Sequence, residues 1–139
     1  MSLEGFIPYV NQIATFLTRR CYEQICINLG MQNCNVRLIG NGAGLVYSPL
    51  GTTHLATDDI ALMRVIPNVT ILAPADAMEM KNVMAQTLLH KGPIYVRIAK
   101  GGDEICSNIF PKSYTLGNIK KLSPNSKTML ISTGIMLNI

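Results

Sequence analysis

The sequence predicts an α/β fold in which a parallel sheet is flanked by helices. Short segments rich in β-branched residues alternate with longer segments of helical apolar spacing, which is the pattern of successive βαβ units. The segment 69–73 is a continuous apolar run, as expected for a strand buried on both faces of a parallel sheet. With 139 residues, of which 48% are hydrophobic, the chain has enough apolar side chains for one compact core.

The first expected elements surround a glycine-rich loop. Residues 6–10 predict a short buried strand, and apolar positions at helical spacing over 12–29 predict one long amphipathic helix that ends at Gly30. Residues 36–39 predict the next strand. The loop 40–44 follows it directly, and its glycines permit positive φ and a close approach of the backbone.

The central elements have acidic helix caps. Residues 57–59 can cap a helix that runs through Ile66. After the next strand, Asp76 and Glu79 have the spacing of an N-cap residue with a reciprocal acid, so they predict the start of a second helix. Residues 94–98 predict the strand that follows this helix.

The chain changes character after Gly101. Residues 103–127 are rich in Asn, Ser, Lys, Pro and Gly and are expected to form a linker. Residues 128–133 predict one more strand, and the apolar segment after Gly134 predicts a helix that breaks off at Ile139. We therefore expect a truncated chain, whose exposed apolar surface favours self-association.

The composition argues against several classes of partner. The net charge is +4, but basic residues are adjacent only at Arg19–Arg20 and Lys120–Lys121, which does not favour nucleic-acid binding. No apolar run approaches the roughly 18 residues that span a membrane. We therefore expect a soluble cytoplasmic protein without a membrane partner. Charged residues make up only 14% of the chain, which indicates apolar surface that meets another chain or domain.

Sequence motifs exclude further classes. Gly40-x-Gly42-x-Gly44 is not the dinucleotide-binding pattern G-x-G-x-x-G, because Leu45 stands at its last position and Ala61 stands where the acidic residue is expected. The cysteines lack the spacing of zinc ligands. They are interpreted as small buried apolar residues, namely Cys21, Cys26, Cys34 and Cys106.

The two histidines differ in their surroundings. His90 lies at the end of the second predicted helix beside Lys91, where a structural role near the negative helix terminus is expected. His54 lies in the loop 51–54 between a strand end and a helix start, where open α/β sheets bind ligands. From the residues alone, His54 is as compatible with a solvent-exposed position as with a functional one.

Several motifs occur in one consistent order between Gly5 and Gly101. They are Thr15-Phe16, Arg19-Arg20-x-Tyr22-x-Gln24, Gly51-Thr52-Thr53-His54, Asp58-Asp59-Ile60-Ala61-Leu62-Met63-Arg64, Ile66-Pro67-Asn68-Val69-Thr70, Pro74-Ala75-Asp76-Ala77-x-Glu79 and Gly92-Pro93-Ile94-Tyr95-Val96-Arg97. Together they closely resemble the pyrimidine-binding domain of the transketolase family. The segment from Thr128 to Gly134 resembles the opening of that family's carboxy-terminal domain.

The resemblance implies domain boundaries and a function. It implies a pyrimidine-binding domain over 5–102 that is incomplete at its N-terminal side, a linker over 103–127, and the start of a carboxy-terminal domain over 128–139. The implied activity is transfer of a two-carbon ketol unit between sugar phosphates by thiamine diphosphate, of which this chain would contact only the aminopyrimidine side. Mg²⁺ and the diphosphate would lie on a partner domain or subunit. The chain is therefore expected to be inactive alone and to work in a homo-oligomer.

The same resemblance assigns roles to particular residues. Phe16 matches an aromatic that stacks on the aminopyrimidine, and Tyr22 is a second cofactor-binding candidate. His54 matches a histidine that faces the substrate and can hydrogen-bond a sugar hydroxyl or relay a proton. Lys100 stands where the family often has an arginine near the substrate phosphate, and Arg20 is a second candidate for an anionic substrate. Core packing is the alternative interpretation for Phe16 and Tyr22, and simple exposure for Arg20.

Two departures from the family pattern affect these expectations. The family's glutamate that hydrogen-bonds the pyrimidine ring and activates the cofactor lies upstream of the segment matching Phe6 to Phe16, so this sequence begins too late to include it. Leu50 stands where many members carry an aspartate, and Gly42 where some have a histidine. The variant loop 44–50 therefore indicates a branch with another donor or acceptor, such as a modified sugar.

Two other function classes remain open. The β-subunit of a thiamine-dependent 2-oxoacid dehydrogenase has the same domain, although the segments 66–68 and 74–76 favour transketolase. A non-catalytic oligomerisation module is the third interpretation. It is motivated by the missing glutamate and by the non-polar residues Gly42 and Leu50.

Overall fold

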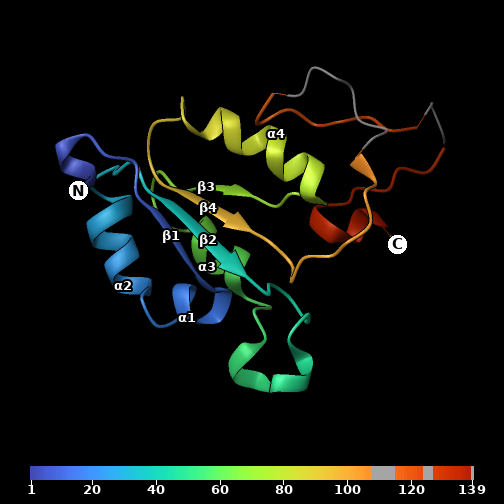
Figure 1. The fold of residues 1–139 in the computed structure, drawn as a ribbon, viewed down its shortest axis with the longest axis horizontal. Helices are drawn as coiled ribbons and strands as arrows, with labels where there is room; N and C mark the ends of the chain where they lie inside the picture. The colour runs from blue at the N-terminus through green and yellow to red at the C-terminus, as the bar shows by residue number, and fades with distance from the viewer. Residues whose placement is uncertain (108–114, 124–126, 139) are drawn as a thin grey trace.

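The chain forms a four-stranded sheet in which all strands are parallel, which confirms the predicted fold class. The computed structural model describes residues 1–107, 115–123 and 127–138. The strand order is β1-β2-β4-β3 (Figure 1). The strands are β1 (Tyr9–Ile13), β2 (Arg37–Asn41), β3 (Thr70–Leu72) and β4 (Ile94–Arg97).

Helices cover both faces of the sheet (Figure 1). One face packs against α1 (Ala14–Thr18), α2 (Tyr22–Gln24), the π-helical segment η2 (Ile25–Gly30) and α3 (Asp59–Arg64). The other face packs against α4 (Ala77–Thr87). Because successive residues of a strand point to opposite faces, the two helical layers cover two separate apolar clusters.

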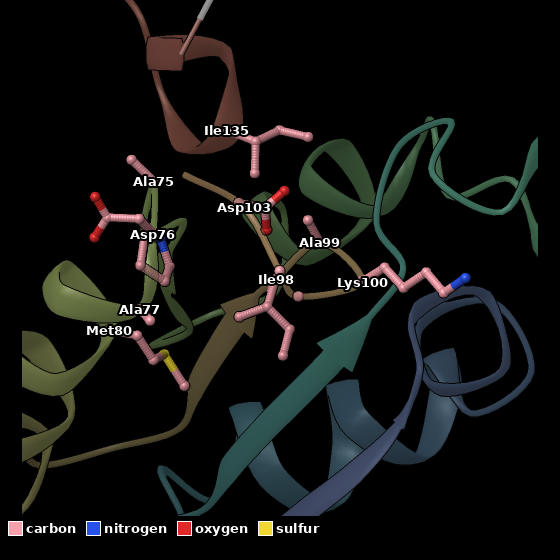
Figure 2. A pocket seen from close by; sticks show the side chains of 12 residues that line it. Ala75, Asp76, Ala77, Met80, Ile98, Ala99, Lys100, Asp103 and Ile135 are labelled. Atoms are coloured by element: carbon pink, nitrogen blue, oxygen red, sulfur yellow. The ribbon is translucent and has the colours of Figure 1, made fainter. Parts of the chain in front are cut away.

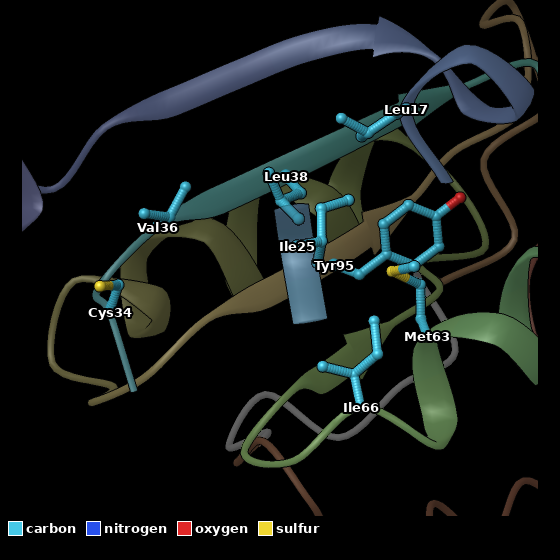
Figure 3. Close-up of a cluster of buried hydrophobic side chains, with 8 residues drawn as sticks. All are labelled: Leu17, Ile25, Cys34, Val36, Leu38, Met63, Ile66 and Tyr95. Carbon is cyan, nitrogen blue, oxygen red and sulfur yellow. The ribbon is translucent and has the colours of Figure 1, made fainter. Parts of the chain in front are cut away.

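The larger apolar cluster lies under α1, η2 and α3 (Figure 3). Its buried members are Leu17, Ile25, Cys34, Val36, Leu38, Met63, Ile66 and Tyr95. The second cluster lies under α4 and contains Leu72, Val83, Ile94 and Val96. Tyr95 therefore faces one helical layer, while its strand neighbours face the other, as the pleat of β4 requires.

The two outer strands are less buried than the sequence predicts. β1 begins at Tyr9 rather than at residue 6, and its first four residues are exposed, because it has a strand neighbour on one side only. β3 is the opposite edge of the sheet, and only Leu72 of its residues is buried. Burial on both faces is therefore wrong for β3. It is the inner strand β4 that is buried, over residues 94–96.

The helix predicted over 12–29 is not continuous. Its first part belongs to β1, α1 ends at Thr18, and the chain turns before it continues as α2 and η2. The Thr18 hydroxyl donates to the Ala14 carbonyl at 2.8 Å, and such a bond one turn back bends helices. Gly30 ends η2 without a left-handed cap. A β-carbon there would lie 2.9 Å from the Pro67 carbonyl oxygen, so close packing explains this glycine.

Of the two predicted acidic helix caps, one forms and the other does not. Asp76 accepts a hydrogen bond from the Glu79 amide at 2.9 Å, and Glu79 accepts one from the Ala75 amide at 2.7 Å. This reciprocal arrangement confirms the cap predicted for α4. Asp58 is the N-cap residue of α3, but its side chain makes no capping bond, because its carboxylate binds Arg19 instead.

The described residues after Gly101 form no strand. The strand predicted over 128–133 is wrong: this segment is exposed, and no described strand lies beside it to satisfy its backbone groups. The expected helix start is a 3₁₀ turn, η6 (Gly134–Asn138). Residues 108–114 and 124–126 of the expected linker lie outside the described part of the chain.

Candidate functional site

The candidate site residues follow the carboxyl ends of the parallel strands. Phe16 and Arg20 come after β1, His54 lies in the loop after β2, and Lys100 follows β4. In a parallel sheet the carboxyl ends of all strands lie on the same side, which is where open α/β sheets bind ligands. The topology therefore brings residues from distant parts of the sequence to the same edge.

A hollow of about 320 Å³ lies between α1 and the loop that carries His54. It is lined by Thr15, Phe16, Arg19, Arg20 and Thr53. The half-buried Phe16 ring meets the His54 ring edge-on, with 5.0 Å between the ring centroids and an angle of 65° between the planes. The Arg20 guanidinium lies over the same Phe16 ring, 4.6 Å from its centroid. Phe16 thus contacts two of the other predicted site residues, Arg20 and His54.

The His54 imidazole is held by its own loop. His54 ends the 3₁₀ turn η4 (Thr52–His54), and its Nδ1 lies 2.9 Å from the Thr53 hydroxyl oxygen. The Tyr47 ring faces it at 6.3 Å between centroids, nearly perpendicular. Tyr47 occupies the space that a side chain at Gly42 would need, and Gly42 has a φ of 69°. Glycine at this position therefore leaves room for an aromatic neighbour of His54.

A buried carboxylate supports the glycine loop. Asp59 is 1% exposed and accepts hydrogen bonds from the Tyr95 hydroxyl and from Arg97 Nε, both at 2.8 Å. Burial and the Asp59 charge raise the pKa of Tyr95, so its hydroxyl stays protonated and donates. A β-carbon at Gly44 would lie 3.3 Å from the Arg97 guanidinium, and Gly44 pairs with Ala56 through two backbone hydrogen bonds. Arg97 therefore has a structural role beneath the glycine loop.

Two predicted site residues lie outside this hollow. Tyr22 is half-buried and packs against the larger apolar cluster. Lys100 is exposed and lies at a second hollow of about 190 Å³, between the end of β4 and the start of α4. Figure 2 shows its side chain directed away from Asp76 and Met80 of that hollow.

The sequence assigned no role to Thr15 and Arg19, which line the first hollow, or to Tyr47, which lies beside His54. Thr15 and Arg19 were part of a recognised motif, but no role was expected for them. Their spacing of one helical turn places them on the same face and is the signal that could have found them. Tyr47 has no such signal, because its approach to His54 depends on the folded loop.

The described residues contain no group of three or more His, Cys, Asp or Glu side chains arranged to hold a metal ion. The cysteines are all free. No helix in the described part of the chain is long and apolar enough to cross a membrane.

These features define an α/β domain whose candidate ligand site lies at the carboxyl edge of a parallel sheet. Residues 1–102 match the family described as the transketolase pyrimidine binding domain. The chain therefore belongs to this family, as the order of its motifs predicted.

Relatives and a solved structure agree with this membership. A transketolase family protein from Sinorhizobium fredii is 34% identical over 136 residues, which are 98% of this chain and 39% of that protein. A 6-deoxy-6-sulfo-D-fructose transketolase subunit from a Clostridium species is 28% identical, over 96% of this chain and 41% of that protein. A split-gene transketolase, described as an inactive β4 tetramer, aligns with a TM-score of 0.67 and 29% identity over 81% of this chain and 35% of that chain. This chain thus spans about two fifths of the length of the curated relatives named here.

Proposed function

We propose that this chain forms the aminopyrimidine side of a thiamine diphosphate site in an enzyme that transfers a two-carbon ketol unit between sugar phosphates. The observation that carries the proposal is that Phe16, which lines a hollow beside the carboxyl ends of the strands, contacts both Arg20 and His54. Family membership supports it, because the family is defined by a pyrimidine-binding domain.

The residues around the hollow fit a flat heteroaromatic ring. Phe16 offers an apolar ring at the wall of a space of about 320 Å³. Because the Arg20 guanidinium now lies over this ring, cofactor binding exchanges a cation–π contact for ring stacking. Thiamine diphosphate supplies the covalent chemistry of ketol transfer, while the protein orients it and handles protons. Tyr22 packs into the core and has no contact with the cofactor in this proposal.

His54 is the proposed proton-handling group of this chain. The Thr53 hydroxyl engages its Nδ1, which leaves Nε2 for a sugar hydroxyl of the substrate. An imidazole in that position can hydrogen-bond the hydroxyl or relay its proton during transfer. The edge-on contact with Phe16 brings the imidazole ring close to the aromatic ring that would bind the cofactor.

The substrate class is an anionic sugar. Arg20 lines the hollow, and Lys100 lies farther along the same sheet edge, so two cationic side chains are available for a phosphate or sulfonate. The Clostridium relative is named for a sulfonated sugar. Side-by-side assays with a phosphorylated and a sulfonated ketose would distinguish the two anions.

The active unit is proposed to be larger than this chain. The chain spans 39% and 41% of two relatives, and in the proposal a complementary domain or subunit supplies the diphosphate site and Mg²⁺. Calorimetry should show thiamine diphosphate binding by the assembly and none by the chain alone. Tight binding to the chain alone without Mg²⁺ would contradict this division.

Substitutions in the assembled enzyme test the two roles separately. Phe16→Ala should weaken cofactor affinity by about tenfold, because a stacked aromatic pair contributes about 0.5–1.5 kcal/mol. His54→Ala should leave cofactor affinity unchanged and lower kcat for ketol transfer by about 10²- to 10⁴-fold. Met31→Ala, at an exposed position outside the hollow, is the matched control. Wild-type turnover in His54→Ala, or 2-oxoacid decarboxylation in place of ketol transfer, would refute the proposal.

A further inference from the structure

Two side chains one helical turn apart hold the main chain on both sides of His54. The Thr15 hydroxyl of α1 donates to the Thr53 carbonyl at 2.8 Å, and Nη2 of Arg19, at the end of α1, donates to the Leu55 carbonyl at 2.8 Å. The Thr53 carbonyl belongs to the peptide that precedes His54, and the Leu55 carbonyl belongs to the residue that follows it, so the same helix holds the main chain on both sides of His54. That helix also carries Phe16, against which the imidazole packs.

Arg19 is itself held in place by Asp58. Its Nε lies 3.0 and 2.9 Å from the two carboxylate oxygens, and its Nη2 lies 2.8 Å from one of them. A guanidinium is a rigid fork, so this paired contact fixes the direction in which Nη2 points. The guanidinium lowers the pKa of Asp58 below its ordinary value, and the pair therefore stays charged at neutral pH.

The contribution of this ion pair to stability is small. The Arg19 and Asp58 side chains are 39% and 44% exposed, and such surface pairs contribute only about 0–1 kcal/mol. Yet Asp58 forgoes the capping bond of α3 to make this contact. The same guanidinium donates to the carbonyl of Leu55, the residue after His54. Because the ion pair adds little stability, we attribute to it the positioning of this loop rather than stabilisation of the fold.

The loop is also held by backbone hydrogen bonds on either side of His54. The His54 amide donates to Gly51 within the turn η4, and Ala56 exchanges two backbone hydrogen bonds with Gly44. Among the described residues, the Thr15 and Arg19 contacts are the hydrogen bonds that connect the main chain of residues 53–55 to α1. Without the Arg19 contact, the Leu55 amide would still donate to Thr52 and the Ala56 amide to Gly44, but Leu55 would no longer be attached to α1.

We propose that Arg19, oriented by Asp58 and assisted by Thr15, is a positioning residue that fixes the His54 imidazole against Phe16. The geometric part of this inference stands on the contacts alone. Its consequence for activity rests on the catalytic role proposed for His54. A displacement of about 1 Å is enough to cost about 100-fold in rate when a catalytic group is misplaced. Arg19 therefore acts through His54 without touching the substrate.

The geometry is tested by NMR on the full chain, which contains only two histidines. The ring protons of His54 feel the ring currents of Phe16 and Tyr47, whereas His90 is bonded to Thr70 elsewhere in the fold and serves as an internal reference. In Arg19→Ala the His54 signal should move toward the position of a free histidine, with the His90 signal unchanged.

Three further variants separate positioning from charge and from folding. Arg19→Lys keeps the charge but not the fork, so it should fail to restore the His54 signal. Thr15→Val removes only the hydroxyl and should shift the same signal by a smaller amount, and it replaces Arg19→Ala as the test if that variant does not fold. Arg64→Ala, at an exposed position of α3, should shift neither histidine.

Activity of the complete enzyme gives the second readout. Arg19→Ala should lower kcat by about 10- to 100-fold, with KM within about twofold. An unchanged His54 signal in both Arg19→Ala and Thr15→Val overturns the positioning role, whatever the activity does. A shifted His54 signal with wild-type turnover leaves the positioning role standing and refutes the catalytic role of His54, so the two failures are distinguishable.

Discussion

At the scale of single residues, Asp76 shows how one carboxylate connects distant parts of the chain. It accepts hydrogen bonds from the amides of Glu79, Cys106 and Ser107 and from the Ser107 hydroxyl, at 2.6 to 2.9 Å. These contacts bind the segment after β4 to the start of α4. Burial by itself raises the pKa of Asp76, but the hydrogen bonds from Ser107, Glu79 and Cys106 outweigh it and lower the pKa well below 3.8.

The depressed pKa of Asp76 predicts a pH-dependent contribution to stability. A carboxylate whose folded-state pKa is lowered stabilises the fold fully above its unfolded pKa of 3.8, and this stabilisation is lost as the pH falls below that value. Asp76→Asn should therefore lower the free energy of unfolding at pH 7 by about 1–3 kcal/mol, with a smaller difference at pH 3. Urea unfolding of both proteins at pH 7 and pH 3 measures this difference in the free energy of unfolding. An equal difference at pH 7 and pH 3 would show that the charge of Asp76 is not involved.

At the scale of elements, a buried arginine ends α4. Arg37 of β2 is fully buried, and its guanidinium donates to the carbonyls of Thr87 and His90 at 2.5 and 2.9 Å and to Gly92 at 2.9 Å. The last carbonyls of a helix have no partner within the helix, so they need donors from elsewhere. A positive charge is also favourable at the negative end of the helix dipole. Arg37 thus fixes α4 and the following turn to the start of β2.

Replacement of Arg37 should strongly lower the free energy of unfolding. Arg37→Met keeps most of the volume but leaves buried carbonyls without donors, so the free energy of unfolding should fall by at least about 3 kcal/mol. Arg64→Met removes an exposed arginine and should change it by no more than about 0.5 kcal/mol. Thermal or urea unfolding of both variants gives the comparison. A loss below about 1 kcal/mol for Arg37→Met would mean that water or other donors satisfy these carbonyls.

How far the sequence predicts each element depends on how local its causes are. The start of α4 is set by Asp76 and Glu79 within one turn, and it was predicted correctly. The exposure of β1 and β3 depends on strand order, which no local pattern contains, so their burial was overestimated. Asp58 satisfies the rules for a helix cap, but a remote Arg19 competes for it. Arg37 gave no signal, because an arginine inside a strand is ordinarily expected at the surface.

The candidate site follows the same rule. The family resemblance named Phe16, Arg20 and His54, and in the structure Phe16 contacts both of the others beside a hollow that Phe16 and Arg20 line. Their contacts with each other were not predictable from spacing, because the loop that carries His54 is positioned by hydrogen bonds from α1. The same resemblance named Tyr22, whose packing into the core is set by the break after α1.

At the scale of the whole molecule, both outer strands of the described sheet have a single strand neighbour, and β1 is the more exposed of the two. The outer side of β1 has no strand neighbour, and its first four residues are exposed. Val10 is 41% exposed and Phe6, just before the strand, is 58% exposed. An uncharged edge strand with unpaired backbone groups readily pairs with another chain. β1 contains no charged residue that would oppose such pairing.

The open edge predicts self-association of the chain through β1. Val10→Lys places a charge on the exposed edge and should shift the chain toward monomer, because an edge lysine opposes strand pairing. The substitution is at an exposed site, so the free energy of unfolding of the monomer should change by no more than about 0.5 kcal/mol. Light scattering and sedimentation over a range of concentrations measure the association.

A second lysine substitution separates the position of the charge from the charge itself. Val65→Lys, at an exposed apolar position at the end of α3, is the matched control and should leave association unchanged, since Val65 is 70% exposed but belongs to no strand. Equal association of Val10→Lys and the unaltered chain would exclude β1 as the contact, and equal loss in both variants would attribute association to net charge instead.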